Sequence, residues 1–213
     1  IKRFYGMITN VDDNFARLER KLEELGLREN TILIFTTDNG TAGGNRVYDA
    51  GMKGGKGSVY EGGHCVPFYI RWPQGGIAGG KDVEALVAHY DLLPTFVDLL
   101  NLDFNPPKAL DGISLKPLLY GEAENWPNRV LYMDTQRELN LVKYKSYTVM
   151  DNNWRLVNGK ELYDMRTDLA QTQNVIDEHP EVAERLSLGY DDWWSSIMEE
   201  SVSDSYTHIK VGT

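Results

Sequence analysis

The sequence predicts an α/β protein: part of a mostly parallel sheet with flanking helices, followed by a small α+β subdomain with an antiparallel sheet. A helix-type apolar repeat at 10–25 precedes an unbroken apolar run at 32–35, which is typical of a helix–strand unit with a buried strand. A stretch rich in Pro, Gly and Asn at 103–129 then separates this part from several short β-type runs. We therefore expect one domain part over residues 1–125 and a subdomain over 126–213.

The first predicted helix carries one apolar stripe, because Phe15, Leu18, Leu22 and Leu25 recur at helical spacing. Gly26 follows, and glycine is the residue that most often ends a helix in the left-handed conformation. The helix is therefore expected to stop here and to lead through a short turn into the strand.

The segments after this strand alternate between loop and regular structure. Residues 40–63 are dense in glycine and have no period, which indicates a long loop of the kind that often carries function. Residues 66–73 (VPFYIRWP) indicate a further strand, and 91–101 indicate a helix with Asp91 as its N-cap.

The C-terminal part has a different pattern. Its four short β-type runs are RVLYMD, KSYTVMD, NWRLV and KELYDM, and Asn158-Gly159 between the last two is typical of a type I′ hairpin turn. Residues 180–200 indicate a closing helix or helix pair, with Gly189 as the weak point.

Composition excludes some classes of protein. The 213 residues carry a formal net charge of −10, so no basic surface is expected for nucleic acid. No apolar run approaches the roughly 20 residues that span a bilayer, so no membrane insertion is expected. No signal peptide is visible, and any targeting segment is expected to lie outside this sequence. The single cysteine, Cys65, cannot form an internal disulfide and does not indicate a compartment.

The stretch 54–67, GGKGSVYEGGHCVP, invites comparison with a phosphate-binding loop. A Walker A loop requires a glycine five residues before the Gly-Lys pair and Ser or Thr after it. Here Ala50 and Gly57 occupy those two positions. The sequence therefore does not predict nucleotide binding.

The triplet Asp38-Asn39-Gly40 has two interpretations. These residue types favour turns. The triplet also follows a predicted buried strand, where ligands of open α/β sheets gather, and its carboxylate and amide oxygens are donors that suit Ca²⁺ or Mg²⁺. Two ligands are too few, because Ca²⁺ takes about six to eight oxygens.

Five segments together resemble the C-terminal half of a sulfatase of the arylsulfatase family, in the alkaline-phosphatase-like superfamily: TILIFTTDNG, GKGSVYEGGHCVP, VAHYDLLPTFVDLL, LDGISLKPLLYG and ELYDMRTDLAQTQNVIDEHPEV. The resemblance covers nearly the whole chain. It implies that Asp38 and Asn39 are metal ligands, usually for Ca²⁺ and alternatively Mg²⁺. It also implies that Lys56 is a catalytic residue that binds the sulfate group. His64, Arg46 and Tyr48 are further candidates for substrate contact.

Two further residues near Lys56 in the sequence, Glu61 and Cys65, each carry an expectation. Glu61 is expected to have a structural role, pairing with a basic residue or capping backbone donors. Cys65 stands where relatives usually have Arg. The run Cys65-Val66-Pro67 is not the nucleophile motif C/S-x-P-x-R, because Tyr69 occupies the position of the arginine.

No C/S-x-P-x-R motif occurs in the sequence. We therefore expect the C-terminal portion of a metal-dependent sulfatase that hydrolyses sulfate esters of carbohydrates. Its formylglycine nucleophile is expected outside this chain, and the chain alone is expected to be inactive. Expected partners are a sulfated small molecule or glycan and the missing N-terminal part, in the periplasm or secreted. Two alternatives stay open: a non-catalytic sulfated-glycan binder or degenerate sulfatase, and a phosphodiesterase or phosphonate hydrolase of the same superfamily.

Overall fold

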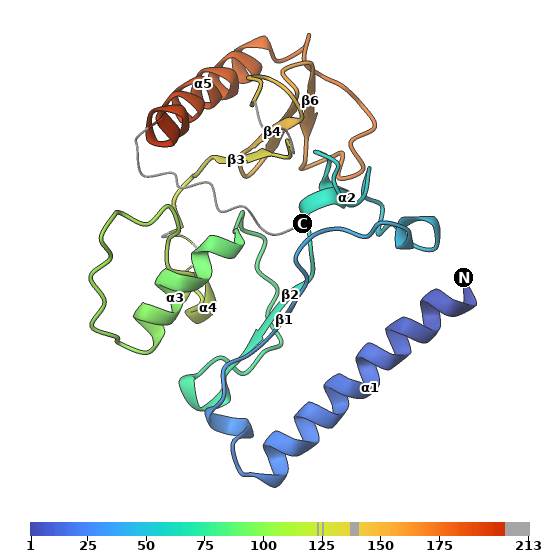
Figure 1. The fold of residues 1–213 in the computed structure, drawn as a ribbon, viewed down its shortest axis with the longest axis vertical. Coiled ribbons are helices and arrows are strands. Elements are labelled where there is room, and N and C mark those ends of the chain that lie inside the picture. Colours follow the sequence, from blue (N-terminus) through green and yellow to red (C-terminus); the bar gives the residue numbers. More distant parts are fainter. Residues whose placement is uncertain (123, 125, 137–140, 203–213) are drawn as a thin grey trace, which may run out of the picture. The chain divides into compact units, whose positions relative to one another are not determined.

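The computed structural model describes residues 1–122, 124, 126–136 and 141–202, and the chain forms two compact units. The first unit combines residues 1–38 with 66–128, and the second combines 39–65 with the residues from 129 onward (Figure 1). The glycine-dense loop therefore belongs to the same unit as the C-terminal sheet. The predicted domain division at residue 125 stays a prediction, and its second part runs beyond the described residues.

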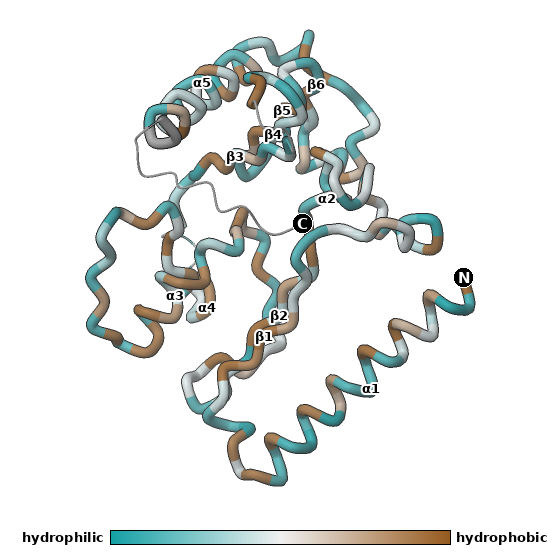
Figure 2. Tube along the Cα trace, in the orientation of Figure 1, coloured by the Kyte–Doolittle hydropathy of each residue, from teal (hydrophilic) through white to brown (hydrophobic). Residues whose placement is uncertain are grey.

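The first unit begins with helix α1 (Lys2–Glu24), which starts earlier than the sequence predicts. Hydrophobic and hydrophilic residues alternate along its whole length, so the amphipathic pattern continues to its start (Figure 2). The predicted end is confirmed, because Gly26 has φ +67° and the Leu27 amide donates to the Leu22 carbonyl at 2.8 Å. The Phe15 ring packs edge-on against Phe35 at a centroid distance of 5.6 Å.

Strand β1 (Leu33–Thr36) pairs with β2 (Phe68–Arg71), and the Arg71 guanidinium forms an ion pair with Glu19 of α1 at 2.7 Å. The helices and strands fit the predicted α/β class. This pair, however, is antiparallel rather than parallel. Parallel neighbours need a long crossover, usually a helix. The connection here contains only two short turns, η2 (Gly44–Arg46) and α2 (Glu61–His64).

The remaining elements of the first unit are short: η1 (Arg28–Asn30), η3 (Pro73–Gly75), η4 (His89–Asp91), α3 (Leu92–Leu99) and α4 (Lys116–Tyr120). Asp91 occupies the N-cap position of α3, as predicted, but its side chain caps the preceding turn η4 instead of α3. Its buried carboxylate accepts hydrogen bonds from the Ala88 amide at 2.7 Å and from the Ile113 amide at 3.0 Å. The carboxylate thereby joins the start of this helix to the later segment around Ile113.

The second unit contains the predicted antiparallel sheet, in the order β3 (Leu131–Asp134), β4 (Tyr147–Met150), β5 (Trp154–Val157) and β6 (Glu161–Asp164). The predicted type I′ turn is confirmed by positive φ values of 52° at Asn158 and 63° at Gly159. The closing segment is one continuous helix, α5 (Pro180–Val202), which passes through Gly189 without a break.

The two faces of this sheet have different neighbours, because side chains alternate along a strand. Leu156 belongs to the core that contains Leu186 and Tyr190 of α5. Val157, the next residue, packs instead with Val59 of the glycine-dense loop. The loop therefore covers the face of the sheet opposite α5. In the described part of the chain, every helix is too short or too polar to cross a bilayer.

Candidate functional site

Lys56 is an exposed lysine in the loop between η2 and α2. Its backbone amide donates to the Thr41 carbonyl at 2.9 Å, which ties this point of the loop to the segment that follows Asn39. Its ammonium group has no hydrogen bond or ion pair to any residue that the structure describes. The side chain therefore presents an unneutralised positive charge that suits an anion.

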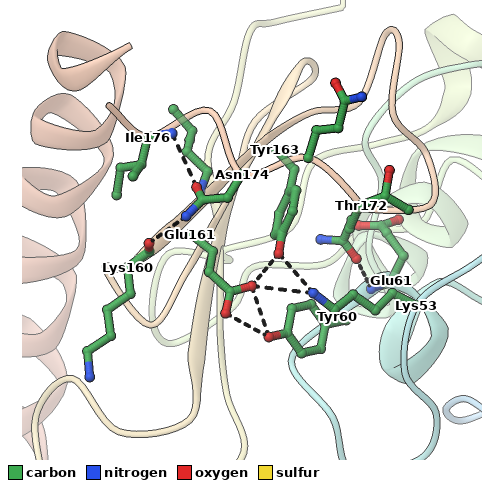
Figure 3. A network of polar contacts seen from close by, with 12 residues as sticks. Lys53, Tyr60, Glu61, Lys160, Glu161, Tyr163, Thr172, Asn174 and Ile176 are labelled. Atoms are coloured by element: carbon green, nitrogen blue, oxygen red, sulfur yellow. Dashed lines mark hydrogen bonds and ion pairs between the residues drawn. The ribbon is translucent and has the colours of Figure 1, made fainter. Parts of the chain in front are cut away.

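Lys53, the other lysine of this loop, is fully engaged within the second unit (Figure 3). Its Nζ lies 2.9 Å from the Tyr163 hydroxyl and 3.5 Å from Oε2 of Glu161, and it sits 4.1 Å above the centroid of the Tyr60 ring. A cation above an aromatic face gains electrostatic attraction in addition to the ion pair. Of the two loop lysines, only Lys56 is thus available to a ligand.

Glu161 is the centre of this network, and it accepts hydrogen bonds from the hydroxyls of Tyr163 and Tyr60, the latter at 3.0 Å. Burial alone would raise the pKa of Glu161, but these hydrogen bonds and the charge of Lys53 outweigh it and lower the pKa. Burial and the bond to Glu161 raise the pKa of Tyr163. A charged carboxylate flanked by neutral phenols therefore holds Lys53 on the sheet.

A second connection between loop and sheet is made by Glu61, which is buried at the start of α2. Its Oε1 accepts from Nε of Arg155 at 2.6 Å and lies 3.2 Å from Nε2 of His64. Burial alone would raise its pKa, but His64 and Arg155 together lower it to about 2. Its amide donates to Oε1 of buried Gln171 at 2.8 Å. The sequence predicted that Glu61 has a structural role and pairs with a basic residue or caps backbone donors, and the ion pair with Arg155 confirms this prediction.

The glycines of the loop are required by close backbone packing. The Gly40 amide donates to the Gly63 carbonyl at 3.0 Å, and the Gly62 amide donates to the Lys53 carbonyl at 2.8 Å. A Cβ at Gly40 would lie 1.9 Å from the Gly62 carbonyl oxygen, and one at Gly63 would lie 2.1 Å from the carbonyl oxygen of Ser58. Neither Gly62 nor Gly63 has a positive φ, so space rather than backbone conformation demands glycine at these two positions.

The two predicted metal ligands lie directly after β1. Asp38 is exposed and makes no hydrogen bond or ion pair with the described residues, and Asn39 is half-buried. One residue earlier, the Thr37 carbonyl lies 3.0 Å from Nε2 of His89. Within the described residues, no group of three or more His, Cys, Asp or Glu could hold a metal ion. Asp38 and Asn39 thus offer oxygen donors of the right kind for Ca²⁺ or Mg²⁺ but not a complete set.

The other candidates for substrate contact are placed differently. His64 points into the loop, since its Nε2 meets Glu61 and its Nδ1 is buried without a hydrogen-bond partner among the described atoms. Arg46 ends η2 and is exposed, as is Tyr48 two residues later. Of these three, Arg46 and Tyr48 are free to meet a ligand without rearrangement.

Cys65 directly follows α2 and is an exposed residue. Partial desolvation and the nearby Glu61 carboxylate raise the pKa of its thiol. A nucleophilic cysteine needs a lowered pKa, so the environment supports the interpretation that Cys65 is not a nucleophile. The cation that faces Glu61 is Arg155, which comes from the sheet rather than from position 65.

Sequence reasoning did not find Arg155, Gln171, Glu161 or Tyr163, because each meets the loop from more than 90 residues away in sequence. One signal was present in the sequence. An arginine between Trp154 and Leu156, inside a strand pattern with large apolar neighbours, indicates a buried cation that needs a carboxylate.

Comparison with known proteins connects this arrangement to a family. A family model described as sulfatase matches residues 1–102, and one described as N-sulphoglucosamine sulphohydrolase, C-terminal, matches residues 54–188. The N-acetylgalactosamine-6-sulfatase of Mus musculus is 29% identical over 201 residues, which cover 89% of this chain and 38% of the relative.

Two solved structures share the fold. Ps i-CgsB in complex with k-i-k-neocarrahexaose has a TM-score of 0.76 and 25% identity, covering 88% of this chain and 42% of its own. The phosphonate monoester hydrolase of Agrobacterium radiobacter has a TM-score of 0.66 and 28% identity, covering 92% and 40%. The likeness to such structures confirms the predicted alkaline-phosphatase-like α/β fold. The chain spans about two fifths of the length of these proteins.

Proposed function

Because the chain belongs to the sulfatase family, we propose that it is the C-terminal part of a metal-dependent enzyme that hydrolyses sulfate esters. The observation that carries this proposal is Lys56, whose ammonium stands free on a loop that is otherwise closely bonded to the C-terminal sheet. A free cation on a fixed loop is what recognition of a tetrahedral anion requires.

Hydrolysis of a sulfate ester breaks an S–O bond, and negative charge develops on the leaving oxygen and on the sulfate oxygens. A positioned ammonium stabilises that charge most strongly where water is excluded. In this proposal Lys56 binds a non-bridging sulfate oxygen and orients the sulfur for attack. A local positive charge also attracts an anionic substrate to a chain whose formal net charge is −10.

Asp38 and Asn39 would contribute a carboxylate and an amide oxygen to a divalent cation, Ca²⁺ by family resemblance and Mg²⁺ as the alternative. The cation supplies further positive charge beside the sulfate group. The formylglycine nucleophile and the remaining metal ligands belong, in this proposal, to a part of the protein outside this chain.

Carbohydrate sulfates are the proposed substrates. The likeness to an N-acetylgalactosamine-6-sulfatase and to a structure solved in complex with k-i-k-neocarrahexaose supports this class. Exposed Arg46 and Tyr48 would contact the sugar, since a guanidinium suits a second acidic group and an aromatic ring stacks on a pyranose. His64 is retained as a weaker candidate, because Glu61 already occupies its Nε2.

A second candidate function is phosphonate ester hydrolysis, favoured by the likeness to the phosphonate monoester hydrolase at 28% identity. The test is to assay the full-length protein with sulfated mono- and oligosaccharides, an aryl sulfate and an aryl phosphonate monoester in parallel. The proposal expects the highest kcat/KM with a sulfated saccharide. A preference for the phosphonate ester would overturn it in favour of the second candidate. Binding of sulfated saccharides without turnover would indicate a degenerate, non-catalytic relative.

A further inference from the structure

We propose that Arg155 of β5 is a positioning residue, which acts through Glu61 to fix the loop backbone from which the Lys56 side chain reaches the sulfate group. This inference rests on the proposed function. It assigns a role to a residue that is distant from Lys56 in sequence and lies in the antiparallel sheet rather than in the loop.

Arg155 is itself rigidly held. Its side chain is only 10% exposed, and its Nη1 donates to the carbonyls of Asp151 at 2.5 Å and Trp154 at 3.0 Å. Its Nε is thereby directed at Oε1 of Glu61, 2.6 Å away. Removing one partner of a buried ion pair leaves an uncompensated charge, so the pair strongly favours this single geometry.

Glu61 passes this constraint to the loop through the backbone of the two residues that follow it, Gly62 and Gly63. The next residue, Gly62, donates its amide to the Lys53 carbonyl, three residues before Lys56. The carbonyl of Gly63 accepts from the Gly40 amide, and the Thr41 carbonyl accepts from the amide of Lys56. Two continuous bonded paths therefore run from Glu61 to Lys56.

The local sequence cannot fix Lys56 by itself. Gly54 and Gly57 on either side of it have φ values of +88° and +83°, and glycine loses more conformational freedom on ordering than any other residue. The loop therefore needs contacts from outside. Lys53 receives one such contact from Glu161, and Glu61 receives another from Arg155. Both contacts come from one face of the sheet, since Tyr163, the hydroxyl partner of Lys53, is directly opposite Arg155 in the β5–β6 register.

The experiment is a double-mutant cycle in the full-length protein with Arg155→Met, Lys56→Ala and the combination, assayed as kcat and KM for sulfate release. Arg155→Met is expected to lower kcat/KM about ten- to a hundredfold, as small displacements of a catalytic group do. In the Lys56→Ala background the same change is expected to have less than about a twofold effect, because its route of action is already gone. An equal fold-loss in both backgrounds would overturn the inference and leave Arg155 a purely structural residue.

Two further measurements keep the test decisive. Arg166→Met removes an arginine of the same unit that pairs with Asp164 at 2.6 Å and is 57% exposed, and it is expected to leave kcat/KM unchanged. Arg155→Lys keeps the charge but loses the fixed guanidinium geometry, and its kcat/KM is expected to lie between those of wild type and Arg155→Met. A kcat/KM as low as that of Arg155→Met would count against a role of the charge.

Amide hydrogen exchange separates this inference from the proposed function. Arg155→Lys is expected to speed exchange at Lys56 and Gly62 at least about tenfold while Val149 of β4 keeps its protection. If the wild-type protein releases no sulfate, the proposed function fails and the exchange result alone decides whether Arg155 orders the loop. Unchanged exchange at Lys56 would overturn the inference even in an active enzyme.

Discussion

Replacing Glu61 by Gln should destabilise the second unit by an amount that the structure allows to be worked out. Residue Glu61 is 7% exposed, and the pKa of its carboxylate is lowered from 4.5 to about 2. Each pKa unit corresponds to about 1.4 kcal/mol, so the ionised form contributes roughly 3 kcal/mol at neutral pH. Glutamine keeps the shape but leaves the Arg155 charge unpaired, and breaking a buried pair in this way typically costs about 3–5 kcal/mol.

The effect should depend on pH with a definite sign. Because the folded-state pKa of Glu61 is depressed, its contribution is fully present above the ordinary value of 4.5 and is lost as the pH falls toward about 2. The difference in free energy of unfolding between wild type and Glu61→Gln is therefore expected to be constant near neutral pH and to shrink through this acidic window.

Urea unfolding of the full-length protein, followed by tryptophan fluorescence between about pH 7 and pH 3, measures this difference, and Trp154 reports from within the affected unit. Glu181→Gln is the matched control, since that side chain is 71% exposed and is expected to change stability by less than about 0.5 kcal/mol. Equal stability of wild type and Glu61→Gln at neutral pH, or a difference that does not change with pH, would refute the reasoning.

Three further predictions concern the loop and its ligands. Gly40→Ala places a Cβ 1.9 Å from the Gly62 carbonyl oxygen, and it should lower the free energy of unfolding by about 1–3 kcal/mol and strongly reduce sulfate release. Gly43→Ala, which has open space around it, should change neither stability nor sulfate release. Equal urea midpoints for the two variants would contradict this prediction. Cys65→Ser should leave kcat/KM within about twofold, because the raised pKa keeps the thiol protonated; a hundredfold loss would show a catalytic role. Chelation of the full-length protein should abolish sulfate release and added Ca²⁺ should restore it; activity that survives exhaustive chelation would exclude the proposed metal.

Local patterns in the sequence predicted most of the elements. The helix end at Gly26, the strand that follows it and the Asn158-Gly159 hairpin each depend on residues close together in the chain, and all three are observed. Strand β1 is, however, half-buried rather than buried as predicted. The antiparallel pairing of β1 with β2 was not predicted, because pairing direction depends on how the long connection folds rather than on either strand.

In the candidate site, too, local motifs could be predicted from the sequence, whereas long-range contacts could not. Lys56 could be proposed from a contiguous motif, and the structure adds that its neighbour Lys53 is occupied elsewhere. Glu61 could be given a structural role, but its partner Arg155 could not be named, because contacts over such sequence distances follow from the tertiary fold. The requirement for glycine at Gly63 likewise became explicit only when the Ser58 carbonyl was seen against it.

The most direct measurement of the central claim is sulfate release by the full-length protein carrying Lys56→Ala. Lys160→Ala, at an exposed lysine of the β5–β6 turn, is the control. If Lys56 holds the sulfate group during bond cleavage, its loss should lower kcat about a hundredfold or more, as removal of a charge-stabilising donor does, while Lys160→Ala behaves as wild type. Activity of Lys56→Ala equal to that of Lys160→Ala would contradict the assignment of this loop as the sulfate-binding part of the site.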